Sequence, residues 1–489
     1  MPRTDELLLN YPDASPVSAE EVERGFQDSG RVLVVLDDDP TGTQSVANLP
    51  VLTRWNVEDF RWAFGIRLGG RPASAVYVLT NTRSLDPDEA AERNRQVVTA
   101  ALIAASETRL AVGFVSRSDS TLRGHYPLEP SVIAETVAAQ GGDGIDGVVI
   151  VPAFPEAGRV TIGSEHYLLE APTLTRVADT EFARDATFGF STSYLPAYIE
   201  EKSAGRVRAH DVIVLDLAVI RSDAATIAAA LEPARDAVPI VVDIVTENDL
   251  RSLALGLEEA ERRGKTLLYR VGPPFVRARI GQTPRMPLTA DEVYGGHSER
   301  AGSAVETGGL IVVGSHVGLT TRQLSRLTAV HRRARIVELD VQQLLDADSA
   351  SDYVARAVDT VVEALRQADV ILHTSRLLVR SDDAAESLRI SRAVSAGVVS
   401  VVNRTLHIFP PRFVIAKGGI TSSDVAANGL EIRRAMVRGP MLPGIVSLWE
   451  ALEGPATGIP YVVFAGNVGD EESLLAVTRK LSSYLSDDG

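Results

Sequence analysis

The sequence predicts an α/β protein of two Rossmann-like domains in series, each a mostly parallel sheet flanked by helices, with the active site in the interdomain cleft. Three observations carry this prediction. Short apolar runs alternate with longer amphipathic segments along the chain. At 489 residues the chain is too long for one ordinary domain. A segment rich in Gly, Pro and polar residues, 281–308, interrupts the alternation and is interpreted as the interdomain connection.

The composition excludes several classes of protein. The net charge of −16 argues against nucleic acid or an anionic membrane as a partner. The absence of cysteine excludes disulfides, thiolate catalysis and zinc–thiolate sites. No apolar run approaches the ~18 residues that span a bilayer, and Asp5 and Glu6 ahead of three leucines do not suit a signal peptide. We therefore expect a cytoplasmic protein with small-molecule ligands; a homodimer is left open.

The first half of the chain predicts an N-terminal arm, residues 1–30, and a domain over 31–280. The arm is expected to end in a short helix over Ser18–Gln27, which begins with capping-box spacing. A long helix is expected over Pro87–Ser106, with proline in its first turn. The predicted strands are the apolar runs Val32–Leu36, Ala75–Leu79, Leu110–Val115, Val148–Val151, Val212–Leu215, Ile240–Val242 and Thr266–Tyr269.

The second half, residues 309–489, repeats the alternation and predicts a second domain of the same class. A helix is expected to open at about Asp424. The predicted strands are Leu310–Val313, Arg335–Glu338, Val370–Leu372, Val398–Val402, Arg412–Ile415 and Tyr461–Phe464.

Polar side chains gather where three strands of the first domain end. They fall in the segments Asp37–Gln44, Thr80–Arg83 and Ser116–Gly124. If the strands are parallel, these segments meet at one edge of the sheet, where ligands of such sheets bind. Arginine suits bidentate binding of a carboxylate or phosphate, and the neighbouring acids and hydroxyls suit sugar hydroxyls. Together the segments favour a site for a polyhydroxylated acid, although any single arginine could instead form a surface salt bridge.

Glycine-rich turns follow three strands of the second domain. They are Gly314–Thr321, Lys417–Asp424 and Ala465–Asp470. Adjacent glycines at the start of a helix let the backbone approach an anion and direct free N–H groups toward it. Lys417 and the hydroxyls of Thr421 and Ser422 would strengthen such a phosphate site. A single turn of this kind is common for steric reasons alone, but three of them suggest a nucleotide phosphate chain.

Four motifs in the right order resemble the four-carbon acid sugar kinase family, an ATP-dependent group with an N-terminal sugar-binding domain and a C-terminal nucleotide-binding domain. The motifs are Asp38-Asp39-Pro40-Thr41-Gly42, Ser118-Asp119-Ser120-Thr121-Leu122-Arg123-Gly124, Gly418-Gly419-Ile420-Thr421-Ser422 and Gly466-Asn467-Val468-Gly469. The resemblance implies phosphorylation of a terminal hydroxyl of a threonate, an erythronate or a 3-oxo-tetronate. The sequence departs from the commoner family pattern at Asp37, which adds a third acid, at Pro40, at Arg117 and at Val468.

The resemblance also implies roles for individual residues. We assign catalysis to Asp38 and Asp39, since an acid of this turn would accept the proton of the attacked hydroxyl. The substrate-binding residues would be Asp37, Arg83, Arg117, Ser118, Asp119, Ser120 and Arg123. The ATP-binding residues would be Ser315, Gly418, Gly419, Ile420, Thr421 and Gly466. Mg²⁺ would bridge the ATP phosphates, and no residues are assigned to it as ligands.

Two other functions fit a two-domain α/β protein. An NAD-dependent sugar-acid oxidoreductase would need a glycine-rich turn directly after a strand. The literal GxGxxG match at Gly142–Gly147 instead precedes a predicted strand. A non-catalytic protein that binds sugar acids or nucleotides with the same fold is the other alternative.

Overall fold

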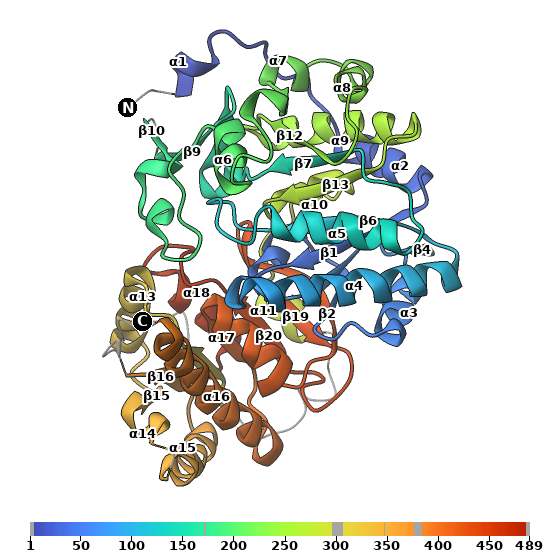
Figure 1. Ribbon diagram of the computed structural model, residues 1–489. Coiled ribbons are helices and arrows are strands. Elements are labelled where there is room, and N and C mark those ends of the chain that lie inside the picture. The colour runs from blue at the N-terminus through green and yellow to red at the C-terminus, as the bar shows by residue number, and fades with distance from the viewer. Residues whose placement is uncertain (1–3, 171–172, 296–306, 347, 376–383, 486–489) are drawn as a thin grey trace. The chain divides into compact units, whose positions relative to one another are not determined.

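The computed structural model in Figure 1 describes residues 4–170, 173–295, 307–346, 348–375 and 384–485. The chain divides into two compact units, Met1–Pro284 and Arg285–Gly489. Residues 296–306 of the predicted connection lie outside the described residues. Among the residues that are described, no helix is both long and apolar enough to cross a bilayer.

The first unit is built on a sheet in which every neighbouring pair of strands is parallel. In spatial order the strands are β11 (Ile213–Leu215), β12 (Val238–Val242), β7 (Gly147–Val151), β13 (Leu267–Val271), β6 (Ala111–Arg117), β1 (Arg31–Asp37), β5 (Ala75–Leu79) and β2 (Leu49–Leu52). All seven predicted strands are confirmed. β2 escaped prediction because its four residues include Pro50 and show no alternation.

Helices cover both faces of this sheet. Alternate residues of β1, such as Val34 and Leu36, pack in one core with Phe60, Val97 and Ile133 from helices on that face. The opposite face is covered by helices that include α9 and α10 (Figure 1). The helices are α1 (Thr4–Leu8), α2 (Ala19–Asp28), α3 (Val57–Gly65), α4 (Pro87–Thr108), α5 (Leu128–Ala139), α6 (Leu195–Lys202), α7 (Leu217–Ile220), α8 (Ala224–Leu231), α9 (Glu247–Arg262) and α10 (Pro274–Arg279).

The two helices predicted in this unit are confirmed, with side-chain caps at their N-termini. Ser18 accepts a hydrogen bond from the Glu21 backbone at 3.1 Å, and Asp86 accepts one from Glu89 at 2.9 Å. The arm ahead of α2 is fastened to the unit, since Asn248 accepts a hydrogen bond from the Val17 amide at 2.8 Å.

A small antiparallel sheet lies outside the main sheet of the first unit. It consists of β8 (Arg159–Ile162), β9 (Glu165–Glu170) and β10 (Thr173–Arg176), in the order β10-β9-β8. We did not predict it, because its short strands mix charged and apolar residues. A two-residue pair, β3 (Arg67–Leu68) with β4 (Arg71–Pro72), completes the strands of this unit.

The second unit has a mixed sheet. Its strands, in spatial order, are β18 (Arg434–Leu442), β19 (Ile445–Ala451), β20 (Pro460–Phe464), β17 (Val414–Lys417), β14 (Leu310–Val313), β16 (Val370–Thr374) and β15 (Arg335–Leu339). β18, β19 and β20 pair antiparallel, and the other pairs are parallel. The helices are α11 (Ala290–Tyr294), α13 (Gly318–Val330), α14 (Val341–Leu345), α15 (Ala350–Leu365), α16 (Ala384–Ile408), α17 (Gly419–Asp424) and α18 (Ser473–Leu481).

Two predictions for the second unit are wrong. The expected strand Val398–Val402 lies inside α16. Val398, Val401 and Val402 are buried there, which is the i, i+3, i+4 pattern of one helix face. The helix expected to open at about Asp424 begins at Gly419, directly after the glycine turn, and a single π turn over Val425–Gly429 continues it. The other five predicted strands are confirmed.

Candidate active site

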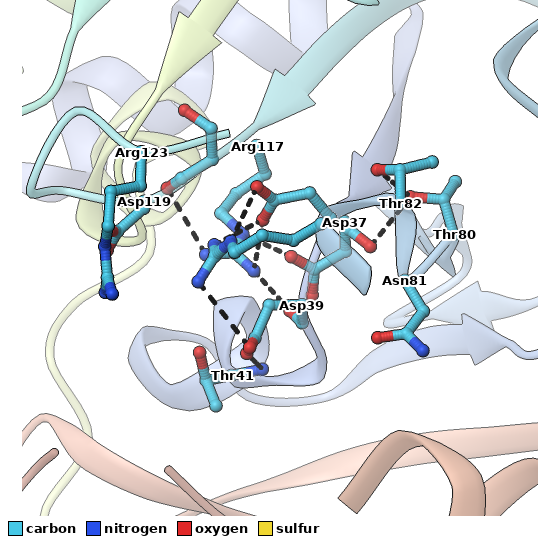
Figure 2. Close-up of polar contacts among 12 residues, drawn as sticks. Asp37, Asp39, Thr41, Thr80, Asn81, Thr82, Arg117, Asp119 and Arg123 are labelled. Atoms are coloured by element: carbon cyan, nitrogen blue, oxygen red, sulfur yellow. Dashed lines mark hydrogen bonds and ion pairs between the residues drawn. The ribbon is translucent and has the colours of Figure 1, made fainter. Parts of the chain in front are cut away.

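Three loops of the first unit meet at the carboxyl edge of its sheet. β1 pairs in parallel with both β5 and β6, which places Asp37 opposite Leu79 and Arg117. The Thr80 hydroxyl donates to the Asp37 carbonyl at 2.9 Å, and the Asp38 amide donates to the Arg117 carbonyl at 3.3 Å. Figure 2 shows side chains from all three loops around the acidic turn. The predicted meeting of the three segments at one edge is therefore confirmed.

Asp37 and Arg117 form an ion pair inside the protein. Each side chain is only 2% exposed, and the Arg117 Nε–H donates to the Asp37 carboxylate. The Arg117 Nη2 also donates to the Asp39 backbone carbonyl, which fixes the turn above the pair. The short helix η1 (Pro40–Ser45) crosses this pair at Gly42, where a Cβ would lie 2.2 Å from Asp37 Oδ1. Only glycine fits at this crossing.

Asp38 is held by a second arginine. Arg83 donates to it through two nitrogens, Nε at 3.1 Å and Nη2 at 2.6 Å, which is the bidentate geometry of a strong charged pair. Asp39 differs, because 16% of its side chain is exposed against 2% for Asp38. Its Oδ1 accepts a hydrogen bond from the Thr41 amide at 2.9 Å, and Arg83 Nη1 lies 3.6 Å from its Oδ2. Of the three acids, Asp39 thus presents the most surface to a ligand.

The loop after β6 carries the remaining predicted substrate residues. Arg123 Nε donates to the Asp119 carboxylate at 2.7 Å, and its side chain is 22% exposed. Ser118 and Ser120 are buried, and each is held through its backbone. The Ser118 amide donates to Val271 at 2.9 Å, and the Ser120 carbonyl lies 2.8 Å from Nε2 of His166. The backbone hydrogen bonds of the two serines therefore hold this loop in position.

Burial and neighbouring charge set the ionisation of Asp37. Burial, together with the charges of Asp38 and Asp39, raises its pKa to about 7 despite the opposing Arg117. For Asp39 the balance is reversed. Burial alone would raise the Asp39 pKa, but Arg83, Arg117 and the hydrogen bonds with Thr41 hold it below its ordinary value.

Asp119 is also held in its charged form. Burial would raise its pKa, but Arg123, Arg83 and the hydrogen bond from Thr121 together lower it well below the ordinary value. Asp39 and Asp119 are therefore carboxylates near neutral pH, suited to accept hydrogen bonds from the hydroxyls of a ligand.

Two buried charged residues that we did not predict support the site from behind. Arg270 on β13 lies 3.3 Å from the Glu129 carboxylate on α5, and both side chains are almost fully buried. Glu129 also accepts a hydrogen bond from Thr82 at 2.5 Å. At Gly124 a Cβ would lie 3.1 Å from both Arg270 and Asp38, so the pair adjoins the site loop. A charged residue within the apolar run Leu267–Val271 was the available sequence signal.

The glycine turns of the second unit also meet at one sheet edge. β17 pairs in parallel with β14 and β20, which places Lys417 opposite Val313 and Phe464. The Thr320 hydroxyl donates to Ser315 Oγ at 3.2 Å and lies 2.9 Å from the Gly466 carbonyl. The turns that contain Ser315 and Gly466 are therefore adjacent.

The turn between β17 and α17 places the start of a helix directly after a glycine at the edge of the sheet. Gly418 has φ +128°, a conformation that side chains rarely adopt, and a Cβ there would lie 3.1 Å from Thr421 Oγ1. α17 begins at the next residue, Gly419, and Ile420 in its first turn is 47% exposed. The first N–H groups of a helix have no partner within the helix and suit an anion such as phosphate.

Lys417 does not lie where a phosphate ligand would need it. Its side chain is fully buried, Nζ donates to the Ala465 carbonyl at 2.5 Å, and Nζ lies 3.8 Å from the centre of the Phe464 ring. Burial lowers its pKa to about 7. Our expectation that Lys417 strengthens a phosphate site by direct contact does not fit this geometry. Instead, the side chain fixes the turn after β20.

Family models match both halves of the chain. Residues 33–279 match the sugar-binding N-terminal domain, and residues 310–474 match the nucleotide-binding C-terminal domain. The chain is similar to a D-erythronate kinase of Heliobacterium modesticaldum, with 22% identity over 480 residues that cover 93% of this chain and 98% of the relative.

Two solved structures share the fold. One, from Salmonella typhimurium LT2, carries a provisional tRNA synthase name and superposes with a TM-score of 0.63 at 20% identity, covering 92% of this chain and 100% of its own. The other, Haemophilus influenzae protein HI1011, has a TM-score of 0.57 at 16% identity, covering 91% and 99%. With both domain models matched in order, the chain belongs to the four-carbon acid sugar kinase family.

Proposed function

We propose that this protein is an ATP-dependent kinase that phosphorylates a terminal hydroxyl of a four-carbon sugar acid of the threonate, erythronate or 3-oxo-tetronate type. The observation that carries the proposal is the acidic turn Asp37–Asp39, held by arginines at the carboxyl edge of the sugar-binding domain. The second domain of the chain matches the nucleotide-binding domain family, and the start of α17 after Gly418 is the kind of helix N-terminus that suits phosphate.

The acidic turn supports a division of labour among its three acids. Asp37 is buried on Arg117 and holds the turn in shape. Asp38 is buried on Arg83 and positions that arginine. Asp39 has the most exposed carboxylate and therefore accepts the hydrogen bond and then the proton of the attacked hydroxyl. Its low pKa suits this role, because in a loose phosphoryl-transfer transition state the proton leaves the hydroxyl late.

The phosphoryl donor in this proposal is ATP with Mg²⁺ on its phosphates. The turn Gly418–Thr421 would bind the phosphates through backbone N–H groups and the Thr421 hydroxyl, with Ser315 and Gly466 beside it. Across the described residues, no group of three or more acids or histidines is arranged to hold a metal ion. When bound, Mg²⁺ would enter with the nucleotide and would take most of its ligands from phosphate and water.

A screen of ADP release tests the proposed function. The full-length protein is incubated with MgATP and a panel of four- and five-carbon aldonates and oxo-acids, together with the uncharged tetritols. We expect ADP release with at least one four-carbon acid and little with the tetritols, and mass spectrometry should show a monophosphate of the acid. If no acid gives ADP above the background while an acid still binds, the non-catalytic alternative replaces this proposal.

A further inference from the structure

Arg159 lies next to the predicted substrate loop, although it belongs to the small antiparallel sheet. It opens β8 after the short helix η3 (Pro155–Ala157). Its backbone pairs with Phe154, with N–H to carbonyl distances of 2.8 and 2.9 Å. These bonds therefore fix the backbone position of Arg159 at the start of β8.

The face of β8 that carries Arg159 is turned toward the loop after β6. Val160 and Ile162 pack in a separate apolar core, so Arg159 and Thr161 occupy the opposite face. His166 lies directly across from Thr161 on β9, and Nε2 of its ring is 2.8 Å from the Ser120 carbonyl. This face of the small sheet thus contacts the loop that carries Asp119 and Arg123.

The arginines assigned to the site from the sequence already have acidic partners. Arg117 is paired with Asp37, Arg83 with Asp38 and Arg123 with Asp119. A guanidinium that is saturated by a protein carboxylate has few donors left for the carboxylate of a ligand. Arg117 and Arg83 therefore shape and charge the site more than they bind the acid group, whereas Arg123 donates to Asp119 through Nε and can act together with Arg159.

Arg159 differs from them. Its Nη1 donates to the Ala157 carbonyl at 2.6 Å, while its Nε is buried without a hydrogen-bond partner. Within the part of the chain that the structure describes, no carboxylate forms an ion pair with it. Burial and the nearby Arg123 lower its pKa, and Asp119 opposes them only in part. Arginine remains charged under such conditions, so a partly buried positive charge lacks a counter-ion.

We propose that Arg159 binds the carboxylate of the substrate, and so selects sugar acids over uncharged sugars. This assignment rests on the proposed sugar-acid function. Nη1 is already engaged by Ala157, so the Nε–H is a donor of the guanidinium left without a partner, and a carboxylate that reaches it would accept a charge-assisted hydrogen bond. Arg123, 22% exposed and electrostatically coupled to Arg159, adds positive charge on the same side.

Steady-state kinetics of two Arg159 variants test this inference. The acid identified in the screen is used with Arg159→Gln and Arg159→Lys. Arg176→Gln serves as the control, since Arg176 lies on β10 of the same small sheet and is 62% exposed. For Arg159→Gln we expect the KM for the acid to rise about 10- to 100-fold, the loss expected for charged hydrogen bonds. The KM for ATP should stay unchanged. Arg159→Lys should recover part of the loss, and the control should match the wild type.

If Arg159→Gln has the same KM for the acid as the wild type, the inference is overturned. An equal rise in the KM for the acid and in the KM for ATP would overturn it as well. Calorimetric titration of the acids without ATP separates this inference from the proposed function. If the wild type binds a four-carbon acid without phosphorylating it, and Arg159→Gln binds it about tenfold more weakly or worse, the assignment stands and the kinase proposal fails. If the wild type binds none of the acids, the assignment of Arg159 falls.

Discussion

The crossing of η1 over the buried Asp37–Arg117 pair predicts a severe effect for Gly42→Ala. The added Cβ would lie 2.2 Å from Asp37 Oδ1 and 2.5 Å from Arg117 Nε. Ordinary van der Waals contact begins near 3.4 Å, so the shortfall to the carboxylate is about 1.2 Å. Both side chains are only 2% exposed, so other protein atoms surround them and they cannot withdraw into solvent. The methyl group must therefore push the turn away from the pair or separate the pair itself.

Displacement of the turn and separation of the ion pair set the lower and upper limits of the expected loss of stability. Overpacking a core typically costs about 1–3 kcal/mol, and breaking a buried ion pair costs about 3–5 kcal/mol. We expect Gly42→Ala to lower the free energy of unfolding of the first unit by about 2–4 kcal/mol, which lowers its Tm by roughly 3–7 °C. Displacement of Asp39 together with the turn should also lower kcat at least about tenfold.

Differential scanning calorimetry of the full-length protein, with each transition fitted separately, measures the stability change. Gly65→Ala is the matched control, because Gly65 is exposed at the end of α3 and a Cβ there would meet nothing within 4 Å. Turnover of the acid identified in the screen is measured for both variants. If Gly42→Ala melts and turns over like Gly65→Ala, the buried pair yields easily and our view of a rigid turn is wrong.

Three other substitutions test separate parts of the molecule. Asp39→Asn should lower kcat about 100-fold or more with little change in Tm. Asp38→Asn should lower both kcat and Tm, since it weakens the bidentate pair with Arg83. If Asp39→Asn keeps the kcat of the wild type, Asp39 is not the base. Burial holds the pKa of His166 at about 4, below its ordinary 6.5. As the pH falls from 6.5 to about 4, the unfolded chain therefore takes up the proton before the folded chain does, and the wild type loses stability. His166→Gln should flatten this acid limb of a Tm–pH curve, and parallel curves would contradict the reasoning. The pKa of Lys417 is about 7 in the folded protein, against an ordinary 10.5. Between pH 7 and 10.5 the unfolded chain therefore binds more protons than the folded chain, and stability rises with pH in this range. Lys417→Met should lack that rise in the same Tm–pH measurement.

Most of the parallel architecture could be predicted from the sequence, because buried central strands are continuous apolar runs that alternate with amphipathic helices. The failures occurred where that signal is ambiguous. Val398–Val402 is apolar enough for a strand, and only its position within a 25-residue helix distinguishes the two. The strands β8, β9 and β10 carry too many charged residues to stand out. Their pairing depends on contacts that sequence spacing does not report.

Less of the candidate site could be predicted. The edge where the loops meet follows from parallel strands, and this part is confirmed. The direction of each side chain depends on neighbours across the sheet, so the sequence did not reveal that Arg117 turns inward onto Asp37 or that Lys417 is buried. Arg159 was missed because it does not come directly after a predicted strand, but eight residues beyond Val148–Val151. The roles of all these residues stay predictions until they are measured.

The small antiparallel sheet has a consequence for how substrate preference can change. Its strands pair with one another, and β8 is joined to the segment after β12 by a backbone bridge between Thr161 and Ile244; neither contact involves β1, β5 or β6, so replacing side chains on β8 should leave the register of those strands intact. The acidic turn and its arginines depend on those three strands. The part of the chain proposed to recognise the acid group can therefore diverge while the part proposed to move the proton is retained. Relatives that act on different sugar acids are expected to differ first in this small sheet.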